Sequence, residues 1–384
     1  MKVASSTTPP KNNQDTSKSV GGLTAKALHK FKKNFWGVSS FSFLVICTLV
    51  AIFAYALAPD KSQNANQMHL SVHSKQPGFE VQMLTVPSKV EKQNGFSVFF
   101  FGKKTTATEV PISGYRLTEN GIVITEYTTD GNAGLVKEYL LSAFPEINSV
   151  EAIPSTYVSE KKFILGTDKY GRDLLSRMLI GIRISLAIGF VAVFISLLIG
   201  ISLGAIAGYY GGKVDAAIMW LINVTWSIPT LLLVIAITLA LGKGFWQVFI
   251  AVGLTMWVEV ARVVRGQVMS VKEMQYVTAA RALGFSNWRI ITRHILPNSL
   301  SPVIIISAAN FAGAILIESG LSFLGIGAQP PTPSWGGIIK DHYAYIILGK
   351  PYLAVIPGLA IMCLVTAFML IGNALRDVLD VKNQ

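Results

Sequence analysis

The apolar stretch SLAIGFVAVFISLLIGISLGAIAG, residues 185–208, contains no charged side chain. An α-helix of this length extends over about 36 Å, which exceeds the roughly 30 Å hydrocarbon core of a bilayer. Serine is its only polar residue type. The stretch therefore predicts a transmembrane helix and places the chain among integral membrane proteins.

Five further runs of similar composition predict additional spans. They lie at residues 38–58, 216–241, 245–263, 300–323 and 353–373. Proline inside three of these runs is compatible with a span, because neighbouring helices and local distortions can satisfy the freed backbone groups. We therefore expect an all-α membrane protein with about six transmembrane helices.

The overall composition agrees with lipid as part of the solvent. Hydrophobic residues make up 51% of the chain and charged residues 14%, whereas a soluble domain carries about a quarter charged residues. The formal net charge is +12, but the basic residues cluster beside apolar runs, as orientation in a membrane requires, and this argues against nucleic-acid binding. Cys47 and Cys363 lie within apolar runs and indicate neither a disulfide framework nor a metal site. We expect no cofactor.

The N-terminal region contains a tail and the first predicted span. Residues 1–25 are polar and predicted to be disordered, and residues 1–37 as a whole form a basic cytoplasmic tail. The run 38–58 is the first transmembrane helix. The tripeptide Ala-Leu-Ala at its end resembles a signal-peptidase site, so a cleaved signal is the alternative. The long tail and long apolar run favour an uncleaved anchor.

Residues 59–162 are polar and lack a run of spanning length, so we expect a separate extracytoplasmic insert of α+β type. Two alternating runs, 112–118 and 122–127, flank an Asn-Gly pair and predict a β-hairpin. Further expected elements are strands at 79–85 and 96–101 and an amphipathic helix at 135–144. The insert contains no Cys and no cluster of His and acidic residues, so nothing in it indicates catalysis.

Basic side chains indicate which segments face the cytoplasm. Segment 264–299 carries a single acidic residue, Glu273, against several basic ones, and is predicted to be cytoplasmic. Arg172, Arg177 and Arg183, on the other side of the second span, run against this rule. An amphipathic helix that lies in the membrane interface would explain them.

The cytoplasmic segment contains YVTAARALG at residues 276–284 and HILPN at residues 294–298. This pattern predicts a short helix of small residues, a turn at a glycine, and a second helix that Pro297 stops or kinks. Leu283, Phe285 and Trp288 are apolar residues beside the turn. They indicate either a docking site for another protein or a loop packed on its own chain.

The same segment resembles the conserved cytoplasmic loop of ABC importer permeases, which has a Glu-Ala-Ala triplet, a Gly four residues beyond its last Ala, and a Leu-Pro pair further on. In this chain Thr278 stands in place of the glutamate, which affects only a polar contact of that side chain. The resemblance implies that loop 271–298 couples the chain to ATPase subunits. The implied coupling residues are Thr278, Ala279, Ala280, Arg281, Leu283, Gly284, Leu296 and Pro297.

Further stretches resemble the dipeptide/oligopeptide/nickel branch of these permeases. They are LGTDKYGRD at 165–173, GYYGGKVD at 208–215, and LSFLGIG at 321–327 followed by QPPTPSWG at 329–336. The resemblance covers about residues 163–380 and, by position, the first span. It does not cover the insert.

The resemblance implies a fold, a function and partners. The fold is that of type I ABC importer permeases, with residues 163–380 as the transmembrane core. The chain would form half of a translocation pathway for peptides or a similar small solute in a bacterial inner membrane, with both termini cytoplasmic. Its partners would be ATP-binding-cassette ATPase subunits, a second homologous permease, an extracytoplasmic solute-binding protein and membrane lipid. The chain has no Gly-x-x-x-x-Gly-Lys-Ser/Thr sequence, so we expect it not to be an enzyme and ATP hydrolysis to come from partners.

Glu318 is the clearest ionisable residue inside an apolar run. It is a candidate pathway residue, or it pairs with Lys340 or caps an interfacial turn. Glu259 and Arg262 are expected to form a structural ion pair. The alternative function is a secondary transporter or channel driven by an ion gradient, which would show several such residues and a repeat of broken helices. A membrane-anchored enzyme housed in the insert is a third hypothesis.

The charge pattern leads to a topology prediction. We expect a reporter fused after Gln76 to be extracytoplasmic and one inserted after Gln275 to be cytoplasmic, because basic residues precede the first span and fill segment 264–299. Labelling of intact cells with a membrane-impermeant reagent shows on which side of the membrane each position lies. Access to the Gln275 position from outside would contradict the docking hypothesis, and a mature N-terminus at Pro59 would identify a cleaved signal.

Overall fold

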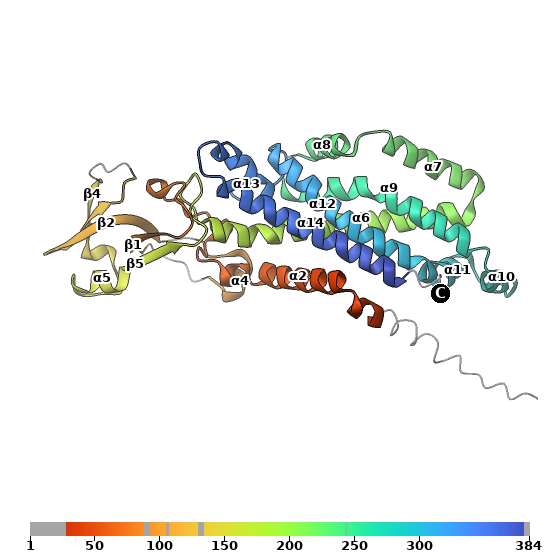
Figure 1. The fold of residues 1–384 in the computed structure, drawn as a ribbon, viewed down its shortest axis with the longest axis horizontal. Helices are drawn as coiled ribbons and strands as arrows, with labels where there is room; N and C mark the ends of the chain where they lie inside the picture. The colour runs from red at the N-terminus through yellow and green to blue at the C-terminus, as the bar shows by residue number, and fades with distance from the viewer. Residues whose placement is uncertain (1–27, 88–92, 105–106, 130–133, 243, 380–384) are drawn as a thin grey trace, which may run out of the picture.

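The computed structural model describes residues 28–87, 93–104, 107–129, 134–242 and 244–379. The molecule is elongated, with long helices along its length, a β-sheet at one end and two short helices at the other (Figure 1). We call these the sheet end and the loop end. Residues 1–25, which were predicted to be disordered, lie outside the described residues.

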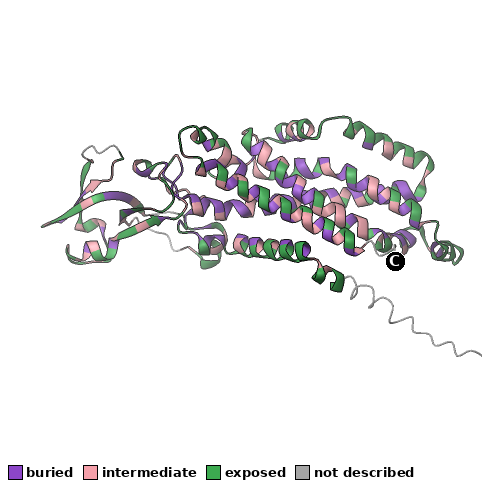
Figure 2. Ribbon diagram, in the orientation of Figure 1, coloured by how far each residue is buried: buried purple, intermediate pink, exposed green. Residues whose placement is uncertain are grey.

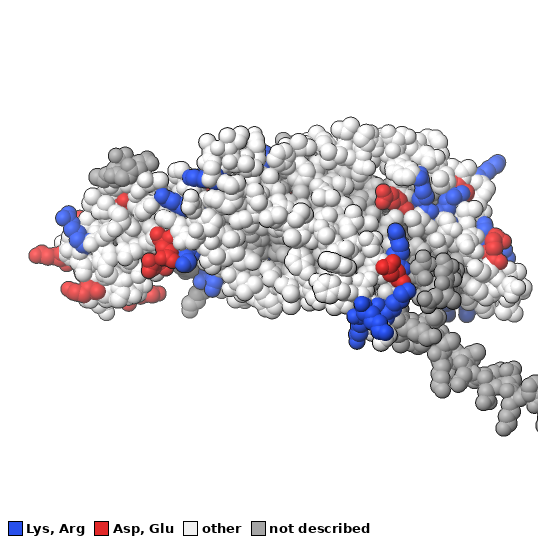
Figure 3. Space-filling view, in the orientation of Figure 1, with Lys and Arg blue, Asp and Glu red and all other residues white. Residues whose placement is uncertain are grey.

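Five helices in the described part are long and apolar enough to cross a bilayer. They are α2 (Phe35–Ile52), α6 (Leu174–Tyr210), α9 (Phe245–Val271), α12 (Leu300–Phe323, continued backwards by helical turns to Asn287) and α14 (Tyr352–Leu379). Exposed residues run along their outer surfaces (Figure 2). On the face shown in Figure 3, charged residues gather toward the two ends and leave an uncharged band between them. The helical membrane fold predicted from sequence is confirmed.

The predicted span 216–241 is wrong as a single helix. The chain forms α7 (Gly212–Trp226) and α8 (Thr230–Leu241), which meet at an angle of 91°. Pro229 lies at the break, where it has no N–H to donate and keeps the preceding residue out of helical conformation. With this pair taken as one broken span, the described part holds up to six spans.

Glycines bring α6 and α9 into backbone contact. Gly200, Gly204 and Gly208 recur at every fourth position of α6 and face α9. A Cβ on Gly204 would lie 2.5 Å from the carbonyl oxygen of Ala261, and a Cβ on Gly208 would lie 2.7 Å from that of Arg265. A larger residue would therefore push the helices apart. Small residues at four-residue spacing are typical of close helix packing in membranes.

The insert forms a five-stranded antiparallel sheet with the order β4-β3-β2-β1-β5. The strands are β1 (Phe79–Val86), β2 (Thr108–Thr118), β3 (Gly121–Glu126), β4 (Val136–Leu140) and β5 (Val158–Phe163). Leu84, Ile112 and Ile122 from the sheet pack against Phe144 and against Ile153 of α5 (Ala152–Tyr157). This cluster gives the sheet a small apolar core of its own.

Local predictions for the insert are partly right. The strand at 79–85 is confirmed as β1, and the hairpin is confirmed because β2 and β3 pair up to Thr118 and Gly121. Residues 96–101, predicted as a strand, instead form α4 (Gly95–Phe101), where the Asn94 side chain accepts a hydrogen bond from the first turn. The helix predicted at 135–144 is also wrong: β4 pairs with β3, and a single 3₁₀ turn, Leu141–Ala143, follows it. Pairing with the preceding strand, β3, decided this segment.

A buried ion pair organises the turn at residues 165–173, which we call the seat. Asp168 is fully buried and accepts a hydrogen bond from Nε of Arg172 at 2.6 Å. Nε of Arg177 lies 3.7 Å from the same carboxylate. The interface helix predicted for these arginines is therefore wrong, because Arg172 and Arg177 are buried around the start of α6. Arg183 donates to a backbone carbonyl of α4 at 2.7 Å.

The segment 60–76 lies against the seat. The N–H of His69 donates to the carbonyl of Tyr170 at 3.1 Å, and the N–H of Lys75 donates to the Thr167 hydroxyl at 2.8 Å. These bonds tie the segment to the beginning of α6. The sheet itself starts only at β1.

Alanine substitution at two glycines with positive φ, one inside the seat and one outside it, tests how tightly the seat is packed. Gly171 has φ +73°, and a Cβ on it would lie 1.8 Å from the carbonyl oxygen of His69, whereas Gly78 has φ +83° and no atom within 4 Å of a Cβ. Gly78→Ala should cost about 1 kcal/mol for its left-handed conformation. Gly171→Ala should cost about 1–3 kcal/mol more, because its methyl group must displace backbone. The unfolding temperature of each purified variant in detergent measures the difference, and equal values would contradict close packing at the seat.

Candidate functional site

The loop end is built from the chain between α9 and α12. Helix α10 (Gln275–Ala282) is followed by a turn at Gly284 and by α11 (Asn287–Ile290). The helical turns Ile291–Ile295 and Leu296–Ser299 then lead into α12. In Figure 1, α10 projects beyond the ends of the long helices.

One face of the loop is packed on its own chain. Val277 and Ala280 of α10 are buried, as are Ile290 and Ile291. They share an apolar cluster with Val264 and other residues of α9. The position of the loop is therefore coupled to the position of α9.

The opposite face of the loop is exposed. Leu283 is 74% exposed and Trp288 is 75% exposed. The other exposed residues among those predicted for the site are Thr278, Ala279, Arg281, Gly284 and Pro297. Phe285 differs from the sequence prediction, because it is half-buried and stacks on the His294 ring at 5.9 Å. The loop is thus packed on its own chain on one side and open on the other, and docking of another protein stays a prediction.

The turn between α10 and α11 requires glycine. Gly284 has φ +77° and its N–H donates to the carbonyl of Arg281 at 3.0 Å. The N–H of Phe285 donates to the carbonyl of Ala280 at 3.2 Å. These two bonds form a Schellman motif, which ends a helix with a left-handed residue. The predicted turn at Gly284 is confirmed.

Pro297 has a smaller effect than predicted. It lies in the 3₁₀ turn Leu296–Ser299, and the chain continues from there into α12. The preceding turn, Ile291–Ile295, is a π-helix. Because π and 3₁₀ turns change the helical pitch locally, the chain can pass the proline without ending the helix. Leu296 is half-buried, so only Pro297 of this pair belongs to the exposed surface.

Contacts that the sequence reasoning missed join the loop to α6. The Tyr209 hydroxyl donates to Oδ1 of Asn287 at 2.7 Å, and the Arg281 guanidinium lies 5.9 Å from the Tyr209 ring centroid. Close by, Arg265 of α9 donates to both carboxylate oxygens of Asp215 at 2.5 and 2.6 Å. Tyr209 and Asp215 both belong to the stretch GYYGGKVD, so the motif was visible in the sequence although its contacts were not.

The ionisable residues predicted inside spans have different environments. Glu318 is buried and accepts a hydrogen bond from the Ser322 hydroxyl at 2.6 Å. In the described part of the chain it forms no ion pair with Lys340. The predicted pair of Glu259 and Arg262 is wrong, because the Arg262 guanidinium lies over the Trp226 ring, 3.5 Å from its centroid.

Comparison with known proteins identifies related sequences. Residues 200–383 match the family model described as "Binding-protein-dependent transport system inner membrane component". The chain is 41% identical to a glutathione transport system permease protein of Pectobacterium atrosepticum, over 57% of this chain and 72% of the relative. It is 42% identical to a dipeptide transport system permease protein of Alkalihalophilus pseudofirmus, over 56% of this chain and 71% of the relative. It is 40% identical to an oligopeptide transport system permease protein of Haemophilus influenzae, over 62% of this chain and 75% of the relative.

Solved structures resemble this chain more distantly. A chain of the inward-facing MetNI methionine ABC transporter aligns with a TM-score of 0.43 and 20% identity, over 53% of this chain and 96% of that chain.

Alanine at two glycines near the loop should have opposite effects. Gly284→Ala forces alanine into a left-handed conformation and should cost about 1–2 kcal/mol. Gly266, inside α9, has nothing within 4 Å of a Cβ, so Gly266→Ala should stabilise its helix by about 0.5–1 kcal/mol. Unfolding temperatures in detergent measure both changes. A loss of stability in Gly266→Ala equal to that in Gly284→Ala would show that the turn has no special requirement for glycine.

Proposed function

The chain belongs to the binding-protein-dependent transport system inner membrane components, the permease subunits of ATP-binding-cassette importers, and we propose that its loop end is the site where ATPase subunits dock. As a member of this family it is a multi-pass membrane protein and is not itself an ATPase. Family membership also separates it from ion-gradient transporters and from membrane-anchored enzymes.

The exposed apolar surface of the loop is the observation that carries the proposal. Leu283 and Trp288 flank the Gly284 turn, and each leaves about three quarters of its side chain exposed, 74% and 75%. Large apolar side chains at a charged end of a protein indicate a contact with another protein. The small Thr278 and Ala279 beside them let a partner approach the α10 backbone closely. We propose that Thr278, Ala279, Ala280, Arg281, Leu283, Gly284, Leu296 and Pro297 form or support this contact.

The packed face of the loop supports its role in coupling. A partner that pushes on α10 would act on α9 through the apolar cluster around Val264, and on α6 through the bond from Tyr209 to Asn287. The Asp215–Arg265 pair would carry the same displacement to α7. Such contacts support a rigid-body switch between inward-facing and outward-facing states when two ATPase subunits close on ATP.

The proposed orientation places the loop end in the cytoplasm. The basic residues of segment 264–299 indicate the cytoplasmic side. Both termini would lie on this cytoplasmic side as well. The sheet end would then be extracytoplasmic, where a solute-binding protein delivers its cargo. We propose the division into a tail (1–37), a first span (38–58), the insert (59–162) and a core (163–380), with the segment 60–76 held against the core by the seat.

Other partners and the substrate follow from the same family. We propose that a second homologous permease completes the translocation pathway and that the solute is a peptide or a similar small molecule, since the named relatives transport dipeptides, oligopeptides and glutathione. Glu318 is a candidate pathway residue because its Oε2 is buried without a hydrogen-bond partner in the described part of the chain. An ionisable group held in this way inside a span is a candidate for function.

Removal of the exposed apolar residues tests the docking site. Leu283→Asp and Trp288→Ser should each weaken binding of the ATPase subunits at least thirtyfold, because central apolar contacts of an interface contribute about 2 kcal/mol or more. Both side chains are exposed, so the amount of permease in the membrane should stay near wild type. Co-purification of the ATPase and ATP-dependent uptake measure the effect.

The matched control removes an exposed apolar residue at the sheet end. Ile347 is 92% exposed, and Ile347→Ser should leave ATPase binding unchanged. Thr278→Ala should have only a mild effect, because a hydroxyl alone is lost. Normal ATPase binding by both loop variants would refute the docking site, even if uptake were reduced.

A further inference from the structure

Helix α4 is a short apolar helix without buried residues. Its sequence is GFSVFFF, and none of its residues is buried. Phe96 is 71% exposed and Phe101 is 63% exposed. In water, such a helix would expose a cluster of phenyl rings to solvent.

α4 packs against the end of α2 and against α6. The Phe99 ring packs edge-on against the Phe53 ring, with 5.7 Å between centroids, directly after the end of α2. Arg183 of α6 donates to the carbonyl of Phe100 at 2.7 Å and holds α4 against the bundle. In Figure 1, α4 lies beside the sheet-end terminus of α2.

The exposed surface of α2 continues into α4. Ile46, Leu49 and Phe53 of this part of the chain are exposed by 58%, 49% and 46% and belong to the predicted lipid-facing surface. α4 continues this apolar surface beyond the end of α2 through the contact of Phe99 with Phe53. The lipid that covers α2 is therefore the occupant that lies next to α4.

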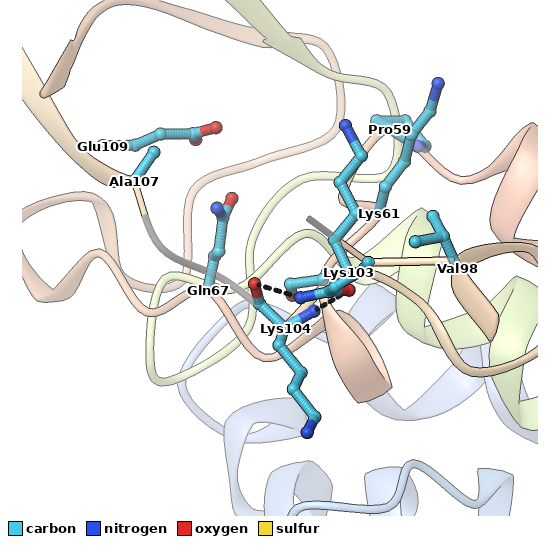
Figure 4. A pocket seen from close by; sticks show the side chains of 10 residues that line it. Pro59, Lys61, Gln67, Val98, Lys103, Lys104, Ala107 and Glu109 are labelled. Carbon is cyan, nitrogen blue, oxygen red and sulfur yellow. Dashed lines mark hydrogen bonds between the residues drawn. The ribbon is translucent and has the colours of Figure 1, made fainter. Parts of the chain in front are cut away.

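Three lysines lie close to α4 in the chain or in space. The backbones of Lys61 and Lys103 pair, because the N–H of Lys103 donates to the carbonyl of Lys61 at 2.8 Å. Their side chains extend side by side in one direction, while that of Lys104 extends the opposite way (Figure 4). All three line a cavity of about 480 Å³ and form no ion pair within the described part of the chain.

The carboxylate in the cavity wall, Glu109, already has a cationic partner in Lys161. Glu109 lies 2.5 Å from Nζ of Lys161 and 3.6 Å from Nε2 of His69. Burial opposes ionisation of Glu109, but hydrogen bonds and charge from His69 and Lys161 prevail and lower its pKa to about 2. The cavity therefore keeps the positive charge of Lys61, Lys103 and Lys104 without a counter-ion from the described chain.

We propose that α4 inserts its phenylalanines into the leaflet at the sheet end while Lys61 and Lys103 bind the phosphate headgroup of an anionic phospholipid. Aromatic side chains at the acyl boundary and lysines at headgroup level are the arrangement by which amphipathic helices lie on membranes. The lipid would anchor the insert to the bilayer at a point remote from the loop end. This inference does not depend on the transported solute.

Spin labels test the depth of α4. In the Cys47→Ala/Cys363→Ala background, the full chain carries a single label at Phe96→Cys or Phe101→Cys and is reconstituted in phospholipid nanodiscs. We expect both labels to be accessible to oxygen and protected from a water-soluble nickel chelate, as at Ile46→Cys in α2. A label at Tyr115→Cys, exposed on β2, should be open to the chelate. Chelate access at positions 96 and 101 equal to that at 115, or protection from both reagents by protein, would overturn the proposal.

A titration tests the headgroup site. The detergent-solubilised chain labelled at Phe101→Cys is titrated with short-chain phosphatidylglycerol, phosphatidylcholine or inorganic phosphate, and label mobility is recorded. Phosphatidylglycerol should bind best, and Lys61→Gln/Lys103→Gln should weaken it about thirtyfold. Lys340→Gln, which changes an exposed lysine outside this cavity, should leave the affinity unchanged. Equal affinity for phosphatidylcholine, an equal response to inorganic phosphate, or no effect of the double substitution would refute the site.

Discussion

The backbone contact between α6 and α9 is the constraint on which the rest of the structure depends. Gly200, Gly204 and Gly208 let the two helices approach until a Cβ would overlap the facing chain. α6 begins at the seat and ends beside the loop, while α9 leads directly into the loop. Because helices in backbone contact cannot slide without losing that fit, displacement at the loop is shared by both. The pair thus connects the two ends of the molecule mechanically.

The sequence predicted what depends on composition and local pattern. Runs of apolar residues located the spans, and the Asn-Gly hairpin and the Gly284 turn followed from residues with strong local preferences. The break at Pro229 was visible as a proline but not as a bend of 91°, since a proline can also be accommodated in a continuous span. Segment 135–144 was misread because pairing with the preceding strand, β3, outweighed its helical pattern.

For the candidate site, too, the sequence predicted the residues but not their contacts or exposure. Its residues were found by resemblance, yet which of them are exposed could not be read from spacing, and Phe285 proved to be half-buried against His294. The bond between Tyr209 and Asn287 joins residues 78 positions apart. Arg172 and Arg177 looked misplaced by the charge rule until Asp168 was seen beside them. The contact of Tyr209 with Asn287 has no signal in a single sequence, whereas Asp168 and Arg172 are four residues apart within one motif.

The pairing of β1 with β5 has a consequence for how such a protein can evolve. Phe79 lies opposite Phe163, so the sheet enters and leaves the helical core through two adjacent strands. The two ends of the sheet therefore lie side by side, and a change in the length of the outer strands β3 and β4 leaves the starting point of α6 in place. New surface can thus be added at the outer strands while α4 keeps its contacts with the end of α2 and with α6.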